Sequence, residues 1–291
     1  MIRVAHGLSV LELDALLGLQ ERTLAVDGGR LKLELAALRR GGGTQVLWQQ
    51  DDRLLGFLGV YAFGPPGVEL AGMVDPAVRG RGIGAALLDA ALQHVRDRSP
   101  VLLLVPRGSA GGLALAQRHG GVLEHSEHAL VLDGPPAALP GPKVSERPAC
   151  PDDAPEVARL LTAAFGRPVA EPAGPDLAAT LVAEVEGVRV GTLRLTREGS
   201  DAAVHGFVID PPHQGRGLGR EVLRQACLRA RHEGAQRVRL EVAVDNERAL
   251  GLYTSLGFAP VLTEDYWQLP YGCRAAIDII TVVNCQVETA T

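Results

Sequence analysis

The chain has 291 residues, of which 46% are hydrophobic and 22% are charged. This length predicts two domains, and the composition is too apolar for an intrinsically disordered protein. A net charge of −5 argues against a nucleic-acid partner, whose phosphates need a basic surface. The sequence shows no leader and no membrane-spanning apolar run, so we expect a cytoplasmic protein without a membrane partner. The 4 cysteines lie far apart, which predicts neither a metal site nor a disulfide framework.

The first part of the chain predicts helices followed by strands. The helical patterns cover 10–25 and 31–39, a hairpin covers 45–61, and a β-type run covers 68–74. This run leads into VDPAVRGRGIG (74–84), and the apolar stripe that follows predicts a helix. The last three elements therefore read as strand, glycine turn and helix.

A linker is predicted where the sequence reads DGPPAALPGPK (133–143), because its prolines and glycines disfavour regular structure. We place the first domain at 1–133, the linker at 134–143 and the second domain at 144–270. The remaining residues, 271–291, have no counterpart in the first half, and their role stays open.

The second part repeats the first. Its predicted elements are a helix at 154–165, a hairpin at 180–195, a strand at 203–209 and final strands at 258–261 and 266–269. The block IDPPHQGRGLG (209–219) matches 74–84 at a constant offset of 135, so that Asp75 and Pro76 recur as Asp210 and Pro211. Chance does not keep this register, which indicates a duplicated domain.

The glycine turns can bind phosphate. A strand that enters such a turn and then a helix presents free backbone N–H groups at the positive end of the helix dipole. Gly215, Gly217 and Gly219 leave room for an anion and Arg216 adds positive charge, while a plain tight turn is the alternative. There is no Walker lysine, and Arg220 stands where a dinucleotide fingerprint needs a small residue.

Both blocks resemble the acetyl-CoA diphosphate loop of the GNAT acetyltransferase superfamily, Q/R-x-x-G-x-G/A. The matches are Arg79, Gly82 and Gly84 in the first half and Gln214, Gly217 and Gly219 in the second. The segment 238–258 resembles the family's other hallmark, a strand, an asparagine and a helix that ends in G-F. The arrangement resembles tandem GNAT enzymes of the mycothiol synthase type. The resemblance implies an α/β (α+β) fold of two tandem domains, each a mixed, mostly antiparallel sheet flanked by helices.

The resemblance also implies a binding site for acetyl-CoA as co-substrate. Asn246 would contact the pantetheine arm and Tyr253 would protonate the departing sulfur, although Asn246 also fits a helix N-cap and Tyr253 a core aromatic. The expected cofactor-binding residues are Val208, Ile209, Gln214, Gly215, Arg216, Gly217, Leu218, Gly219 and Asn246, and in the first half Val74, Arg79, Gly80, Arg81, Gly82, Ile83 and Gly84.

Alignment of the halves sets Ala116 against Tyr253 and Ser109 against Asn246. A methyl group cannot donate a proton, so the resemblance implies a catalytic second half and a catalytically degenerate first half that keeps its phosphate turn.

The general base is harder to assign, because many family members carry a glutamate in the strand at 203–209 and this chain has none there. By strand alternation, His205 shares a face with Phe207 and Ile209, and imidazole suits proton abstraction. We expect His205 to be the base, with Glu241 as the second candidate. Either side chain could instead have only a structural role.

The resemblance implies an N-acetyltransferase that acts on a primary amine of a small molecule by direct attack in a ternary complex. Three alternatives stay open: protein or peptide N-terminal acetylation, a CoA-binding regulatory module without turnover, and aminoacyl-tRNA-dependent transfer. The acceptor has no recognisable motif, and the protein could be a monomer or a homodimer.

Overall fold

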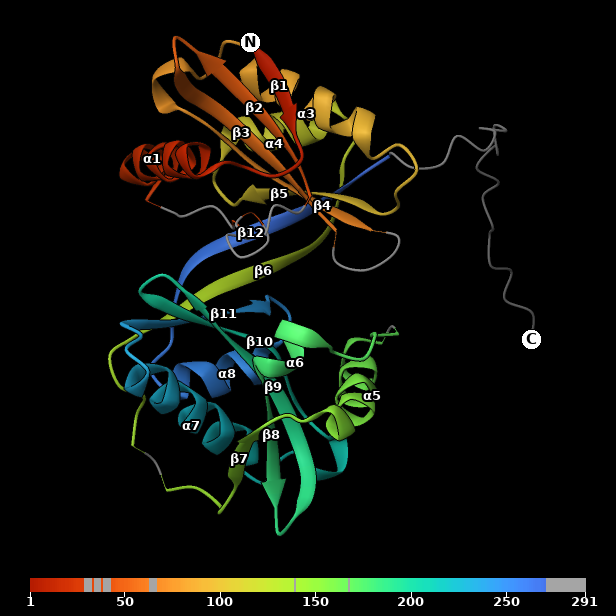
Figure 1. The fold of residues 1–291 in the computed structure, drawn as a ribbon, viewed down its shortest axis with the longest axis vertical. Helices are drawn as coiled ribbons and strands as arrows, with labels where there is room; N and C mark the ends of the chain where they lie inside the picture. Colours follow the sequence, from red (N-terminus) through yellow and green to blue (C-terminus); the bar gives the residue numbers. More distant parts are fainter. Residues whose placement is uncertain are drawn as a thin grey trace, which may run out of the picture.

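A computed structural model describes residues 1–28, 33, 38, 43–62, 67–138, 140–166 and 168–270, which form one mixed α/β structure (Figure 1). The helix expected at 31–39, apart from Leu33 and Leu38, and the tail at 271–291 lie outside these residues. Within the described part, no helix has both the length and the apolar character needed to cross a membrane.

The secondary structure repeats one order of elements. The first half contains β1 (Ile2–Ala5), α1 (Val10–Asp27), β2 (Thr44–Gln50), β3 (Arg53–Tyr61), β4 (Val68–Val74), α3 (Ile83–His94), β5 (Val101–Pro106), α4 (Ala110–Arg118) and β6 (Val122–Asp133). The second half contains β7 (Ser145–Pro148), α5 (Ala154–Phe165), α6 (Gly174–Ala178), β8 (Thr180–Val185), β9 (Val188–Glu198), β10 (Asp201–Ile209), α7 (Leu218–His232), β11 (Arg237–Ala243), α8 (Glu247–Ser255) and β12 (Ala259–Leu269). The predicted duplication and α/β fold class are confirmed.

Both predicted hairpins form around two-residue turns. Asp51 and Asp52 have φ of 49° and 58°, and Glu186 and Gly187 have φ of 51° and 79°. Positive φ at both central residues matches the right-handed twist of the paired strands. The strands of the hairpins β2–β3 and β8–β9 are therefore joined by equivalent turns in the two halves.

The last strand of each half is exchanged with the other half. The 12-stranded sheet has the order β1-β2-β3-β4-β5-β12-β6-β11-β10-β9-β8-β7. Thus β12, from the end of the second half, pairs with β5 of the first, and β6, from the first half, pairs with β11 of the second. The two long strands cross between the lobes and pair with each other (Figure 1). The sheet is antiparallel except at β4–β5 and β10–β11.

The expected strands at 258–261 and 266–269 are one strand in the structure, β12, so that prediction was wrong. Its pairing with β6 shifts register between Pro260 and Leu262 and again between Tyr266 and Trp267. The first shift places the extra residue Val261 on β12 and interrupts the alternation of its side chains without ending the strand, whereas the extra residue of the second shift, Glu124, lies on β6.

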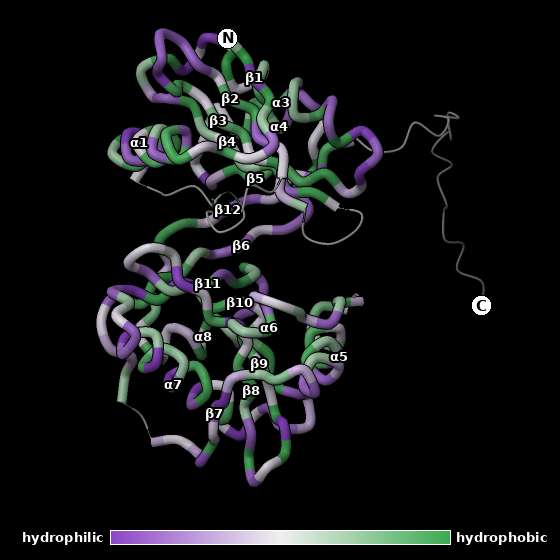
Figure 2. Tube along the Cα trace, viewed as in Figure 1, coloured by the Kyte–Doolittle hydropathy of each residue, from purple (hydrophilic) through white to green (hydrophobic). Residues whose placement is uncertain are grey.

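Helices cover the two faces of the sheet unequally. Side chains from α3 and α4 pack on one face of the first half, and those from α7 and α8 pack on the same face of the second. The opposite face carries α1 and α5. Figure 2 shows apolar segments gathered in the strands of both lobes and polar segments in many of the outer loops.

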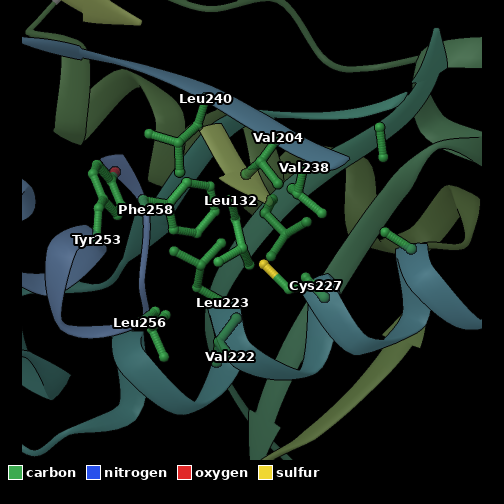
Figure 3. Close-up of a cluster of buried hydrophobic side chains, with 14 of the residues drawn as sticks. Leu132, Val204, Val222, Leu223, Cys227, Val238, Leu240, Tyr253, Leu256 and Phe258 are labelled. Carbon is green, nitrogen blue, oxygen red and sulfur yellow. The ribbon is translucent and has the colours of Figure 1, made fainter. Parts of the chain in front are cut away.

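The exchanged strands also supply core side chains to the other half. Leu132 of β6 packs among Val204, Val238 and Leu223 of the second half (Figure 3). Leu269 of β12 belongs to the first-half core with Val101. The cores of the two halves therefore depend on each other.

We predict that Leu269→Ala destabilises the first half, although Leu269 lies at the end of the second. Leu269 is 1% exposed, and removing a buried leucine side chain costs about 2–5 kcal/mol. Hydrogen exchange should then lose protection first in β4 and β5. The matched control is Leu256→Ala, which is 0% exposed in the second-half core. If both variants loosened only the second half, the exchange of strands would be contradicted.

A buried carboxyl group lies between β7 and α7. Oε1 of Glu146 has no hydrogen-bond partner among the described residues. Burial raises the pKa of Glu146 from 4.5 to about 7, with the positive charge of Arg229 opposing the shift and the negative charge of Glu221 adding to it. The folded protein therefore holds this proton more tightly than the unfolded chain does.

We predict that Glu146→Gln stabilises the protein above pH 7 and has little effect near pH 4.5. Because folding raises this pKa, the free energy of unfolding of the wild type falls as pH rises between these values, by at most about 3 kcal/mol. Urea unfolding at several pH values measures the difference. Exposed Glu171→Gln is the control, and a difference between Glu146→Gln and wild type that does not change with pH would refute the prediction.

Candidate active site

Two equivalent glycine turns precede α3 and α7. Gly80 and Gly82 have φ of 75° and 80°, and Gly215 and Gly217 have φ of 77° and 78°. These left-handed values favour glycine, since a Cβ there is strained. No side chain caps the first turn of either helix, so backbone N–H groups at each N-terminus remain available to an anion.

The residue that begins each loop motif holds its turn against the preceding strand. Arg79 Nε donates to the Val74 carbonyl at 3.1 Å, and Gln214 Nε2 donates to the Ile209 carbonyl at 2.8 Å. Arg79 also pairs with Asp27 at 2.6 Å, a contact that raises the pKa of Arg79. Arg79 and Gln214, both predicted to bind the cofactor, therefore stabilise the loop of their own half through hydrogen bonds to the preceding strand.

A second brace ties each turn to a helix on the opposite face. Asp75 accepts a hydrogen bond from Arg22 of α1 at 2.7 Å, and Asp210 accepts one from Arg159 of α5 at 2.8 Å. Burial alone would raise the pKa of Asp75, but hydrogen bonds from Arg22 and the Ala77 amide, together with nearby arginine charges, lower it below its usual value.

The parallel strands β10 and β11 separate just before the second glycine turn. They pair only from Asp201 opposite Arg237 to Ala203 opposite Arg239. Beyond this point a bulge lies between His205 and Val208, and Gly206 has φ of 56°. The strands β4 and β5 likewise pair only over their first residues, from Val68 to Leu70 on β4.

The predicted orientation of the His205 side chain was wrong, because the bulge follows His205 in β10. Ile209 belongs to the core beneath α7 and Phe207 packs against that core while also bordering a cavity, and across the bulge His205 pairs with Arg194 and Val208 with Thr192. The extra residue reverses the alternation of side chains, so His205 does not share a face with Phe207 and Ile209.

The cavity has a volume of about 1020 Å³ and lies where β10 and β11 separate. Its second-half wall includes His205, Glu241, Asn246 and Tyr253. Its first-half wall includes Gln20 and Leu24 of α1 and Glu127, Ala129 and Val131 of the exchanged strand β6. The cavity is therefore built by both halves.

Tyr253 and Asn246, which the sequence analysis named as candidate site residues, both lie on this wall. Burial raises the pKa of Tyr253 to about 12, which keeps its hydroxyl protonated at neutral pH. The centroids of the Tyr253 and Phe207 rings lie 6.5 Å apart, and the Tyr253 hydroxyl lies at the edge of the hydrophobic cluster (Figure 3). Asn246 Oδ1 accepts from the Ala249 amide at 3.1 Å, so it also caps α8.

The two candidate bases occupy different places on the wall. His205 Nε2 lies 3.1 Å from the hydroxyl of Thr196. Glu241 lies on β11 opposite Ala129 of β6, and its side chain is exposed toward the cavity. Both residues line the cavity.

The predicted cofactor-binding residues divide into two groups. Val208 and Asn246 line the cavity, whereas the turn from Gln214 to Gly219 lies beyond its wall at the start of α7. The turn is linked to α8, because Arg248 donates to Gln214 Oε1 at 3.1 Å. Ile209, Leu218 and Ile83 are buried in the hydrophobic cores.

In the first half, Ala116 is fully buried in the core, and Ser109 caps α4 through the Gly112 amide at 3.2 Å. Neither β4 nor β5 contributes a residue to the wall of the cavity. Like the second turn, the first-half turn contributes no residue to the wall, but the strands that precede and follow it are also absent from the wall.

Charge is distributed unevenly along the cavity. At the end where β10 and β11 still pair, Asp201 accepts hydrogen bonds from Arg237 and Arg239 at 3.0 and 2.7 Å. Burial alone would raise the pKa of Asp201, but these arginines lower it below its usual range. Toward α8 the sheet face carries Glu127 and Glu264. Sequence reasoning missed both, because it assigned the site to the strands of one half.

Comparison with known proteins identifies the family. The model of the acetyltransferase (GNAT) family matches residues 16–120 and 151–258. The mycothiol acetyltransferase of Clavibacter michiganensis subsp. michiganensis is 32% identical over 242 residues, covering 75% of this chain and 77% of the relative. The mycothiol acetyltransferase of Nocardia farcinica is 31% identical over 274 residues, covering 85% and 90%.

Solved structures share the fold. The GCN5-related N-acetyltransferase of Sphaerobacter thermophilus aligns with a TM-score of 0.71 at 20% identity, covering 93% of this chain and 96% of that one. A tandem GNAT protein from the clavulanic acid biosynthesis pathway aligns with a TM-score of 0.63 at 19% identity, covering 92% and 98%. The duplicated loop, the separated strands and these similarities together establish that the chain belongs to the acetyltransferase (GNAT) family, as an acyltransferase with two GNAT domains in tandem.

Proposed function

We propose that the protein transfers the acetyl group of acetyl-CoA to a primary amine of a small molecule, and that the second half carries out the reaction. The main support is the cavity at the separation of β10 and β11, which brings Asn246 and Tyr253 together beside the second glycine turn. The equivalent positions of the first half hold Ser109 and the buried Ala116.

The diphosphate of the coenzyme binds at the turn from Gln214 to Gly219. Its two left-handed glycines and the uncapped start of α7 suit an anion, and Arg216 and Arg248 add positive charge nearby. The acetyl-pantetheine arm then enters between β10 and β11, where backbone groups beyond Ala203 and Arg239 do not pair across the two strands. Asn246 contacts this arm at the start of α8.

Tyr253 acts as the general acid. The amine attacks the thioester carbonyl directly, so the leaving sulfur needs a proton and the carbonyl oxygen needs a donor. A hydroxyl with a pKa of about 12 keeps its proton until the thiolate forms. A backbone N–H beside the bulge at Gly206 polarises the carbonyl. His205 and Glu241 are the candidate bases within the second half.

A small-molecule acceptor fits a cavity enclosed by both halves, and relatives named mycothiol acetyltransferase support this class of acceptor. The favoured division of the chain is an N-terminal domain at 1–133 that binds coenzyme without turnover, a linker at 134–143 and a catalytic domain at 144–270. Thiol release from acetyl-CoA across a panel of small amines and peptide N-termini tests the function. Coenzyme binding without thiol release for any amine would favour a regulatory module instead.

We predict that Tyr253→Phe lowers kcat by about 100-fold while leaving the dissociation constant for CoA nearly unchanged. Phenylalanine keeps the packing against Phe207 and removes only the proton donor. Stopped assays of thiol release and calorimetric titration with CoA give the two quantities. An unchanged kcat would remove Tyr253 from the mechanism.

We predict that the variants Gly217→Ala and Gly82→Ala have different functional effects, because each alters the glycine turn of a different half. Alanine at either left-handed position costs about 1–2 kcal/mol locally and disturbs the anion-binding turn. Gly217→Ala should lower thiol release by about 5–30-fold, whereas Gly82→Ala should weaken a calorimetric CoA-binding step by about the same factor with thiol release retained. Gly199→Ala, at a β-turn with φ of 65°, controls for strain alone. The reverse pattern would place catalysis in the first half.

A further inference from the structure

The exchanged strand β6 brings a carboxylate of the first half to the cavity of the second. Glu127 lies opposite Ala243 of β11 on one side and opposite Glu264 of β12 on the other. Its side chain lines the cavity and is 26% exposed. Because the sequence places it in the first half, the second half alone does not contain it.

Aromatic neighbours hold the Glu127 carboxylate in place. The Tyr266 hydroxyl donates to Glu127 Oε2 at 2.8 Å, and His125 Nε2 lies 3.8 Å from Oε1. The His125 ring stacks on Tyr266, with centroids 4.2 Å apart and planes 17° apart, and Glu124 contacts its Nδ1. One carboxylate oxygen is thus fixed by Tyr266 while the side chain still reaches the cavity.

Glu127 lies at the end of the cavity that adjoins α8. Its neighbour Ala243 ends β11, and the Ala243 carbonyl accepts from the amide of Asn246 at 3.0 Å. The amide of Val244, the residue after Ala243, donates to the Ser126 carbonyl at 2.9 Å. This hydrogen bond joins β6 to the turn between β11 and α8. The hydrogen bonds of this turn therefore connect the strand that carries Glu127 to Asn246 and to the start of α8, the helix that carries Tyr253.

We propose that Glu127 binds the ammonium group of the acceptor and removes its proton, so that the active site of the second half requires a catalytic residue from the first. This inference rests on the proposed function. It supplies a carboxylate in place of the glutamate that β10 lacks, since no glutamate lies between Glu198 and Glu221 and Asp201, the carboxylate at the start of β10, is paired with Arg237 and Arg239. It also gives the catalytically degenerate first half a function, which is to supply a residue to the active site of the second half.

The proton balance is complete with the groups present. Glu127 takes one proton from the ammonium group, and the freed lone pair forms the C–N bond at the thioester carbonyl. The C–S bond breaks toward sulfur, which takes the Tyr253 hydroxyl proton. The second amine proton leaves as the amide forms and restores Tyr253 through solvent, while Glu127 releases its proton to solvent. Overall, one ammonium and one thioester give one amide, one thiol and one proton.

Other charged and titratable groups face Glu127 from the neighbouring strands. They are Glu264 and Tyr266 on β12, His125 and Glu124 on β6, and Glu241 on β11. Negative charge thus predominates among these neighbours, which favours a cationic amine over a carboxylate-bearing one.

We predict that Glu127→Gln lowers kcat/KM for amine acetylation by about 100-fold at pH 7. The amide oxygen can still accept from Tyr266, so folding should be preserved, as the melting temperature will check. The loss should shrink as pH approaches the pKa of the amine, because solution then supplies the neutral form. The acceptor is the amine that wild type acetylates fastest in the panel described above. Titration of this amine into the CoA-bound protein should show weaker binding, with CoA affinity unchanged.

The matched control is Asp133→Asn, a carboxylate on the same strand and the same cavity wall, about 20 Å away. Tyr266→Phe should lower kcat less than Glu127→Gln and alter the pH profile, since it frees the carboxylate without removing it. Equal losses in Glu127→Gln and Asp133→Asn, or a Glu127→Gln loss that does not vary with pH, would overturn the assignment of Glu127. Failure of every amine with wild type would instead reject the proposed function, and this inference with it.

Discussion

The hydrogen bonds along β6 and β12 are the constraint on which the rest of the structure depends. Each strand pairs with a strand of the other half and with its exchanged counterpart, so one sheet runs through the whole molecule. Backbone groups in the centre of a sheet are costly to leave unpaired, and among the described strands neither β5 nor β11 has another neighbour on that side. Separation of the halves would expose both strands and open both cores.

The same exchange shapes the cavity. The α1/α5 face of the sheet is continuous, so α1 of the first half faces the separated strands of the second across β6 and β12. Each half has an anion-binding turn braced from its own strand, by Arg79 or by Gln214. The large cavity is lined by residues of β10 and β11 and by Asn246 and Tyr253, whereas β4 and β5 contribute no residue to it. Duplication thus supplied two equivalent turns, and the tertiary arrangement made them unequal.

Much of the candidate site could be predicted from sequence because its signals are local. Glycines that need positive φ, an asparagine that opens a helix and a tyrosine two turns later are each specified within a few residues. The orientation of His205 was wrong because a bulge adds one residue to a strand without changing its composition. Glu127 was missed because nothing near it in the chain distinguishes it from a solvated strand carboxylate.

By itself, the sequence determined the repeated order of elements, the hairpin turns at Asp51 and Glu186, and the phosphate-type turns before α3 and α7. These features follow from backbone preferences and hydrophobic periodicity, which act over short distances along the chain. Only the tertiary structure decided which half receives each final strand. The final strands β6 and β12 can each complete a sheet, and the choice between partners depends on long-range backbone pairing that leaves no local signature. That choice also decides which carboxylates face the cavity.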